Sequence, residues 1–503
     1  MISSFPHKFL LILCMLWNVT VSHAQDQQGL KNLWLGGYDS DAGIPWGGTD
    51  LEFFNGTREV YYQFRAIDFF RTSTNMTALD GELLFSTNGA FLARSDGDTL
   101  PDGTGLNPSV YTSMVPDGLN IPQAALIIPR PEDAGQYFLL HGTLDDLEAQ
   151  YTRYMYLSII EIDNEGNTSI SLKNEVILDD TLNSGKLTAV RHANGRDWWV
   201  VCHKQYTNIF FKLLITPTGI SPWVQQSIGV MREADLGQVC FSPDGSKFAY
   251  YWGDDEDLEI FNFDRCTGLF SDPVHIPIDD ANAIGGVAFS PNNRFLYVSS
   301  VEDVYQYDTE ASDIEGSMVH IAEWDGFYSP SPPFATLFDI AQLAPDGKIY
   351  ISTGNSTFHL HVINEPDQPG MACDMVQHGV ELPTYYMNSL PNHPNYHLGP
   401  VDGSICDSLG INTGIAEEVL RSAIHVHPNP GQGLFTLNYP AQPVEGLLEV
   451  VDGSGRIIQR KQLSQWTTLH RLDLTGHAPG MYHCRLSWGG QSASTQLIIQ
   501  DPE

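Results

Sequence analysis

The sequence predicts an all-β protein, in which a seven-bladed β-propeller precedes a small immunoglobulin-like β-sandwich. Three observations predict this fold. Short strands recur along the body of the chain, one type of turn recurs ahead of them, and residues 423–503 alternate strand and turn sequences. A chain of 503 residues is too long for one ordinary core, so a large repetitive domain with a small second one fits its length.

Residues 1–24 have the pattern of a secretory signal peptide. Lys8 precedes an apolar run, and Ser22-His23-Ala24 is a small-x-small cleavage pattern. The run is shorter than the ~18 to 20 apolar residues that a spanning helix needs. We therefore expect a mature chain without a membrane-spanning segment, exported from the cytoplasm.

The body of the chain, residues 25–405, repeats a strand pattern. Neighbouring strand centres are separated by roughly 50 to 60 residues, which is typical of propeller blades. The repeated strands are GELLFSTNG (81–89), QYFLLHG (136–142), DWWVVCHK (197–204), KFAYYWG (247–253), RFLYVSS (294–300) and KIYIST (348–353). A second strand, such as NIFFKLLI, DLEIFNFD, DVYQYD or TFHLHVIN, follows each of the last four.

Turn sequences recur at one position in this repeat. SPDG at 242, SPNN at 290 and APDG at 344 each precede a strand, and proline presets the backbone of such turns. A single four-stranded blade cannot bury both faces, so only radial stacking completes the core. Six blades are visible directly, and residues 26–70 with 373–400 are expected to supply the seventh. A stack of β-sandwiches is the alternative architecture.

The tail, residues 423–503, reads as a small antiparallel sandwich. Tyr482, Cys484, Leu486 and Trp488 alternate with polar residues, as in a strand with one face in solvent. The sequence DGSG at 452–455 predicts a tight hairpin turn. Residues 406–422 are the expected linker to the propeller.

Both parts resemble known families. The body resembles the secreted propeller-like region that often precedes sorting domains of the type IX secretion system, although its close, PTYYMNSLPNHPNYHLGP, departs from that family's shorter ending. The tail closely resembles a type A sorting domain of that system. The matching positions are Pro428, Asn429, Pro430, Gly433, Phe435, Asp452, Gly455, Arg456, Asp473, Leu474, Gly480 and Tyr482, with a final apolar strand at 497–499.

The resemblance implies a destination. A sorting domain of this kind implies recognition by the export machinery in the outer membrane of a Gram-negative bacterium. The mature protein would then be anchored at the cell surface or released. The formal net charge of −36 disfavours nucleic acid and anionic membranes as partners and attracts cations.

Cysteines and metal ligands give weaker signals. Six of the seven cysteines follow the signal peptide, and we expect disulfides between Cys240 and Cys266 and between Cys373 and Cys406. Cys202 and Cys484 would stay free, the latter as core.

Two groups of residues are candidate metal ligands. His359 and His361 lie two apart on a strand, as imidazole ligands of zinc would. Asp39, Asp41 and Asp50 lie in a glycine-rich segment that suits Ca²⁺.

The chemistry of the propeller is open at this point. Repeated motifs of sialidase, quinoprotein and WD-type propellers are absent from the sequence, and no local motif of a nucleophilic triad is present. The first hypothesis is a binding or interaction module for an extracellular carbohydrate or protein. The second is a calcium-dependent hydrolase or lyase acting on an extracellular carbohydrate or lactone. The third is a structural component of a surface coat or a gliding adhesin.

Overall fold

The structure is a computed structural model. It describes residues 31–500, apart from 55, 79–80, 134, 149, 164, 233–235, 254–256, 279–283, 331, 408–423, 440–444, 454, 466 and 489–490. The expected signal peptide and almost all of the expected linker lie outside these residues. Within the described ranges, no helix combines the length and the apolar character needed to cross a bilayer.

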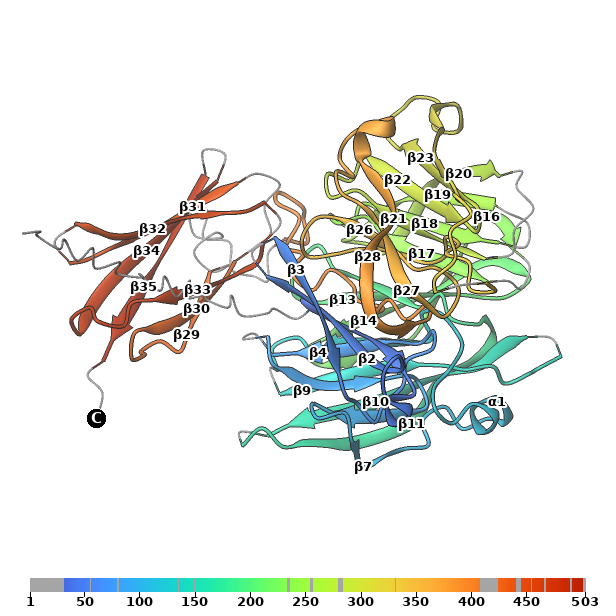
Figure 1. The fold of residues 1–503 in the computed structure, drawn as a ribbon, viewed down its shortest axis with the longest axis horizontal. Helices are drawn as coiled ribbons and strands as arrows, with labels where there is room; N and C mark the ends of the chain where they lie inside the picture. Colours follow the sequence, from blue (N-terminus) through green and yellow to red (C-terminus); the bar gives the residue numbers. More distant parts are fainter. Residues whose placement is uncertain are drawn as a thin grey trace, which may run out of the picture.

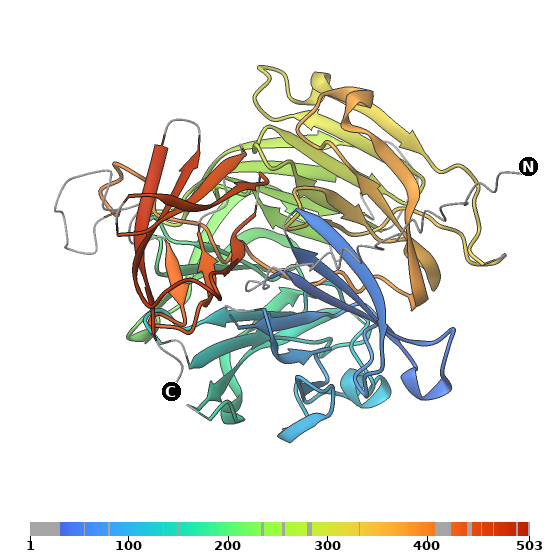
Figure 2. The same ribbon diagram turned by 60° about the vertical axis from the view of Figure 1, so that its left-hand side comes forward.

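Seven antiparallel sheets form the body, and they follow one another around a ring in chain order (Figures 1 and 2). The first sheet contains β1 (Leu33–Tyr38), β2 (Gly47–Phe54) and β3 (Thr57–Gln63). The second contains β4 (Thr74–Thr77), β5 (Leu83–Thr87), β6 (Phe91–Arg94) and β7 (Thr99–Thr104). The third contains β8 (Ala125–Pro129), β9 (Gln136–His141), β10 (Tyr151–Ile162) and β11 (Thr168–Asn183). The fourth contains β12 (Thr188–Arg191), β13 (Trp198–His203), β14 (Thr207–Thr216), β15 (Gly219–Ile220) and β16 (Val224–Arg232).

The last three sheets have four strands each. The fifth contains β17 (Gly237–Phe241), β18 (Lys247–Trp252), β19 (Asp257–Asp264) and β20 (Leu269–Pro277). The sixth contains β21 (Gly285–Phe289), β22 (Phe295–Ser300), β23 (Asp303–Asp308) and β24 (Val319–Glu323). The seventh contains β25 (Ala341–Leu343), β26 (Ile349–Ile351), β27 (Thr357–Ile363) and β28 (Met375–Tyr386). Short helices lie in the connections: α1 (Val110–Met114) and the 3-10 turns η1 (Ser40–Ala42), η2 (Glu315–Ser317) and η3 (Gly370–Cys373). The seven-bladed propeller is thereby confirmed, and the six repeated strands of the sequence are the second strands of six blades.

The recurring turn has one geometry in three blades. The N–H of Gly245 donates to the carbonyl of Ser242 at 2.8 Å, and the N–H of Gly347 donates to that of Ala344 at 3.0 Å. Asn293 donates to Ser290 in the same way at 3.0 Å. All three donors have a positive φ, between 65° and 79°, a conformation that glycine and asparagine tolerate. The turn sequence therefore fixes where the first strand of each blade ends and the second begins.

The ring closes between the last and first sheets through side chains. Thr49 Oγ1 and Thr384 Oγ1 are 2.6 Å apart, and Arg58 donates to the hydroxyl of Tyr350 at 2.8 Å. Trp34 packs with Tyr386 and Leu390 in one buried cluster. The residues expected to complete the seventh blade therefore have separate places. Strand β28 is the fourth strand of the last sheet, and residues after β28 cover the inner side of the first sheet.

The tail forms a second body, a sandwich of two antiparallel sheets. One sheet contains β29 (His425–His427), β30 (Leu434–Asn438) and β33 (Leu469–Asp473), and the other contains β32 (Ile457–Leu463), β31 (Gly446–Val451), β34 (Gly480–Trp488) and β35 (Gln491–Ile499). Tyr482, Cys484, Leu486 and Trp488 are buried between them, as the alternation predicted. Strand β29 begins before Pro428, so the Pro-Asn-Pro sequence joins two strands rather than opening the first.

Candidate functional site

The central channel of the propeller is filled by the protein's own chain. The first strands β12, β17, β21 and β25 line it together with residues 392–395. We call residues 387–407 the channel segment. Strand β28 ends at the face of the ring where Asn388 donates to Asp339, which we call the inlet face. The segment leaves at the opposite, outlet face, where the Asn395 amide donates to Pro243 O at 2.8 Å.

One residue of this segment bonds to several blades. The side-chain amide of Asn392 donates to the carbonyls of Ala125 and Leu187, each at 2.9 Å, and its main-chain N–H donates to Ser73 O at 2.9 Å. These three carbonyls belong to the second, third and fourth blades or to the turns just before them. Asn392 therefore needs the assembled ring to satisfy its hydrogen bonds.

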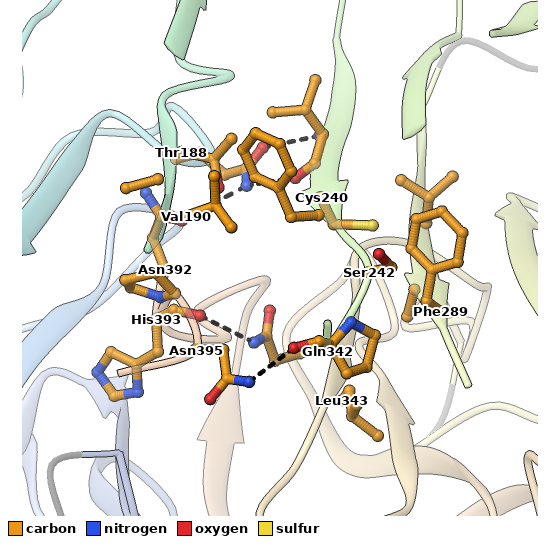
Figure 3. Close-up of a pocket in the computed structure, with 18 of the residues that line it drawn as sticks. Thr188, Val190, Cys240, Ser242, Phe289, Gln342, Leu343, Asn392, His393 and Asn395 are labelled. Carbon is orange, nitrogen blue, oxygen red and sulfur yellow. Dashed lines mark hydrogen bonds between the residues drawn. The ribbon is translucent and has the colours of Figure 1, made fainter. Parts of the chain in front are cut away.

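A small cavity remains beside the segment. It has a volume of about 90 Å³ and is lined by Cys240, Ser242, Gln342, Asn395 and their neighbours (Figure 3). Pockets for small organic ligands usually have ~300 to 1,000 Å³. The channel therefore has no room for a sugar or lactone while the segment is in place.

Two histidines of the segment, the buried His393 and the half-buried His397, carry no charge. The Nε2–H of His393 donates to Asn75 O at 3.0 Å. Burial lowers the pKa of both His393 and His397 to about 3. Both imidazoles are therefore neutral near pH 7 and belong to the packing of the channel.

The predicted histidine pair is divided by its hydrogen bonds. His361 is fully buried; its Nε2–H donates to Leu337 O at 3.2 Å, and its Nδ1 accepts the N–H of His378 at 2.9 Å. Both nitrogens are thus in use, and burial lowers its pKa to about 3. His359 is half-buried, and its Nδ1 lies 2.8 Å from Ser329 Oγ.

The three predicted calcium ligands lie in different environments. Asp50 is buried and forms an ion pair with Arg65, which is also buried. Asp39 and Asp41 are exposed in the loop after β1, where the N–H of Asp39 donates to Asp68 Oδ1 at 2.7 Å. Among the described residues, no three His, Cys, Asp or Glu side chains are grouped so as to hold a metal ion.

A surface cluster near His359 was not visible in the sequence. The loop 324–340 brings Phe327 to 4.3 Å from the ring of His378 and 5.4 Å from that of His359, measured between ring centroids. His378 Nε2 lies 2.8 Å from Asp325 Oδ2. Phe327 is 38% and Tyr328 is 37% exposed. We call Asp325, Phe327, Tyr328, His359 and His378 the loop cluster.

The backbone of the loop cluster is unusual. His378 has φ 40° and lies where the pairing of β27 with β28 shifts register. A positive φ in a non-glycine residue is strained, and such residues are enriched at functional sites. Sequence reasoning missed the cluster because its members come from three separate segments of the chain.

The expected disulfide pairs were wrong. The structure joins Cys266 to Cys406, with Cα atoms 5.6 Å apart, and leaves Cys240 and Cys373 as thiols. Cys240 lies on the first strand of its blade and Cys266 follows the third, so an intervening strand separates them by ~10 Å, beyond the ~7 Å limit for a disulfide. Cys202 and Cys484 are free, as expected.

In the tail, the predicted sorting residues shape turns. Asp452 accepts the Nε–H of Arg456 at 3.1 Å, and Gly455 has φ 82° in the same hairpin. Asp473 Oδ1 accepts the hydroxyl of Thr475 at 2.6 Å and its N–H at 2.8 Å, and these two hydrogen bonds hold the pKa of Asp473 below its usual range. Tyr482 donates its hydroxyl to Ala478 O at 2.6 Å.

The glycines and the Pro-Asn-Pro sequence also have specific contacts. A Cβ on Gly433, which has φ 102°, would lie 3.0 Å from the main-chain nitrogen of Thr475. Gly480 begins β34 with φ 153°. Between Pro428 and Pro430, Asn429 bonds to the last strand, β35, through its side-chain amide.

A comparison with protein families decides the identity of the tail. Residues 425–500 match the family described as a secretion system C-terminal sorting domain. The tail is a type IX sorting domain. It directs the chain through the type IX secretion system to the cell surface or the medium. No curated protein sequence matches the chain.

The solved structures with a similar fold are remote. A putative 6-phosphogluconolactonase from Bacteroides uniformis is 14% identical, with a TM-score of 0.42 over 67% of this chain and 92% of that one. A protein from Lactobacillus plantarum is 12% identical, with a TM-score of 0.42 over 72% and 98%. A gluconolactonase from Xanthomonas campestris is 13% identical, with a TM-score of 0.31 over 66% and 96%. Similarity at this level carries no argument about activity.

Proposed function

We propose that this exported propeller is a binding module, which recognises an extracellular carbohydrate or protein through its outer surface. The observation that carries the proposal is the filled channel. The segment leaves a cavity of about 90 Å³, so a ligand of the size of a sugar must bind elsewhere.

The loops of the inlet face offer the surface for such binding. The two longest connections of the propeller, residues 105–124 and 324–340, both lie there. Connections longer than ~12 to 15 residues are uncommon in compact domains and are often functional. The second one carries the exposed rings of Phe327 and Tyr328, and aromatic side chains are frequent anchors of interfaces.

The alternative of a calcium-dependent hydrolase or lyase gains no support from the geometry of its candidate ligands. Asp50 is buried in an ion pair with Arg65, so its carboxylate is not free to join the exposed Asp39 and Asp41 around a cation. The binding hypothesis is therefore the one that the contacts favour.

Export is tested by removing the tail. A chain without residues 423–503 should fold as a propeller and accumulate in the periplasm, because the deleted sorting domain is the signal for transport across the outer membrane. Fractionation of cells and detection of the propeller in each fraction is the measurement. Truncated protein at the cell surface would contradict this assignment.

Binding is tested with two matched double variants. Phe327→Ser with Tyr328→Ser changes the loop cluster, and Leu269→Ser with Met371→Ser changes apolar residues near the outlet face that are more exposed still. Retention on surface polysaccharides and on outer-membrane protein fractions should fall at least tenfold for the first variant and less than twofold for the second. Equal retention by both variants would refute the proposed surface, and consumption of a retained ligand would favour the enzyme hypothesis.

A further inference from the structure

The two halves of the channel segment are held to different degrees. Residues 388–394 are all buried, and so is Tyr396, whose hydroxyl donates to Ile127 O at 2.9 Å. From residue 397 onward the chain is half-buried or exposed. We call residues 388–396 the inlet half and residues 397–407 the outlet half.

Within the outlet half, Leu398 packs against the hydrophobic cluster of the fourth and fifth blades, and the residues after it are held by few noncovalent contacts. The N–H of Val401 donates to Ala193 O at 2.9 Å, and the guanidinium of Arg265 donates to Gly399 O. Pro400 lies against Gly195, where an added Cβ would meet the ring nitrogen of Pro400 at 2.6 Å. Gly399, Pro400 and Val401 are exposed, so water has access to their side of these contacts, although Arg265 itself is buried.

The disulfide lies at the end of this weakly held half. Cys406 is joined to Cys266, which follows β19, and the sequence separation is 140 residues. Cys266 itself is fixed: its N–H donates to Asp264 Oδ1 at 2.8 Å, and its carbonyl accepts His192 Nε2–H at 3.0 Å. The covalent bond therefore ties the more exposed half of the segment to a turn that is held by hydrogen bonds.

The order of assembly follows from these contacts. Asn392 bonds to three blades at once, so the inlet half can seat only after those blades have come together. Cys406 approaches Cys266 only when the outlet half then lies along the outlet face. Such a bond persists in the oxidising environment outside the cytoplasm and is rare inside it.

We propose that the Cys266–Cys406 disulfide is a lock formed after the chain leaves the cytoplasm, which fastens the outlet half and completes the closure of the propeller around its channel segment. In the locked protein, pulling on the tail acts on the turn at Cys266 and leaves the inlet half seated. Without the bond, the outlet half detaches from the outlet face while the inlet half stays in place.

The reverse step is a thiol exchange with an external dithiol. A thiolate of the dithiol attacks one sulfur of the disulfide, and the bond between the Cys266 and Cys406 sulfurs breaks. The second thiolate of the dithiol then resolves the mixed disulfide. The dithiol loses two electrons and becomes a disulfide, and Cys266 and Cys406 each end as a thiol. Both cysteines are half-buried, so the dithiol has access.

Hydrogen exchange of the whole secreted chain tests the lock. Amides are followed by mass spectrometry with and without dithiothreitol, in the unaltered protein and in the variant Cys266→Ser with Cys406→Ser. Reduction should lower the protection of residues 397–407 at least tenfold and change residues 388–396 less than threefold. The double variant should show the low protection from the start, and dithiothreitol should change nothing further in it.

That variant is its own control for the reductant, because the other four described cysteines remain in it. If the double variant fails to fold, the titration of the unaltered protein with dithiothreitol still shows whether reduction lowers the protection of residues 397–407. Unchanged protection of residues 397–407 on reduction would overturn the proposal. A loss of protection spread over all blades would also overturn it, because the bond would then stabilise the fold generally rather than fasten one segment.

Discussion

Asn429 holds the end of the chain: its side-chain oxygen accepts the main-chain N–H of Ile498 at 2.9 Å. The same amide donates to Gln496 O at 2.7 Å, and the carbonyl of Gly431 accepts the N–H of Gln500 at 2.9 Å. The Pro-Asn-Pro sequence thus covers part of the open edge of β35. Uncovered edge strands readily pair with other chains, so this contact protects the terminal strand.

Asn429→Ala should therefore weaken both the tail and its export. Two main-chain groups of β35 lose their partner at an exposed edge where water can replace it, at a cost of about 1 kcal/mol. The measurements are the thermal midpoint of the tail and the amount of protein at the cell surface. Gln462→Ala is the control, because Gln462 is exposed and bonds to Glu445 by one side-chain contact. Equal surface amounts for both variants would show that the contact is irrelevant to sorting.

Truncation should reveal the role of the channel segment. A chain that ends at residue 407 should keep the propeller, whereas one that ends at 386 should not. The shorter chain leaves carbonyls such as those of Ala125 and Leu187 buried without donors. Circular dichroism and the cooperativity of thermal unfolding distinguish the two chains. Cooperative unfolding of the shorter chain at the same temperature would mean that the segment contributes nothing to closure.

The buried ion pair of Arg232 and Glu259 should be sensitive to loss of one charge. The side chain of Arg232 is 0% and that of Glu259 is 1% exposed, and four aromatic rings surround the guanidinium. Glu259→Gln leaves a buried charge and should cost about 3 kcal/mol in the free energy of unfolding. Arg294→Gln breaks the exposed pair with Asp308 and should cost less than about 1 kcal/mol. Urea unfolding of both variants measures the difference, and similar losses would contradict the argument.

Acid should destabilise the propeller through the channel histidines. The pKa of His393 is about 3 in the folded protein, below the value near 6.5 of an exposed histidine. A depressed folded pKa means that the unfolded chain binds the proton first, so stability is lost as the pH falls below about 6.5. At pH 5 the loss for one such histidine is about 2 kcal/mol relative to pH 7.

The variant His393→Gln tests this pH dependence, because glutamine can still donate to Asn75 O. The fall in the free energy of unfolding between pH 7 and pH 5 should be smaller in the variant than in the unaltered protein. The carboxyls of Asp339 and Asp68 act in the opposite direction, since burial raises the pKa of each to about 6. An identical pH dependence in the variant would show that His393 is protonated in the folded state.

Local patterns carried the sequence predictions that hold. The turns at 242, 290 and 344 impose their geometry through nearby atoms alone, so their recurrence indicated blades before any packing was known. The alternation around Cys484 similarly depends only on the two faces of a strand. The sorting residues could be recognised for the same reason, because Gly433, Gly455 and Gly480 each occupy a position where the local backbone has a positive φ.

Contacts between distant segments decided the rest. The sequence by itself determined the strands, the turns, the propeller repeat and the address of the tail, each of which depends on residues within a few positions of one another. Only the tertiary structure decided that residues 388–396 fill the channel, that Cys406 reaches Cys266 across 140 residues, and that Phe327 contacts His378. The physical reason is that ring closure brings these groups together, and no local propensity encodes which blade lies beside which residue.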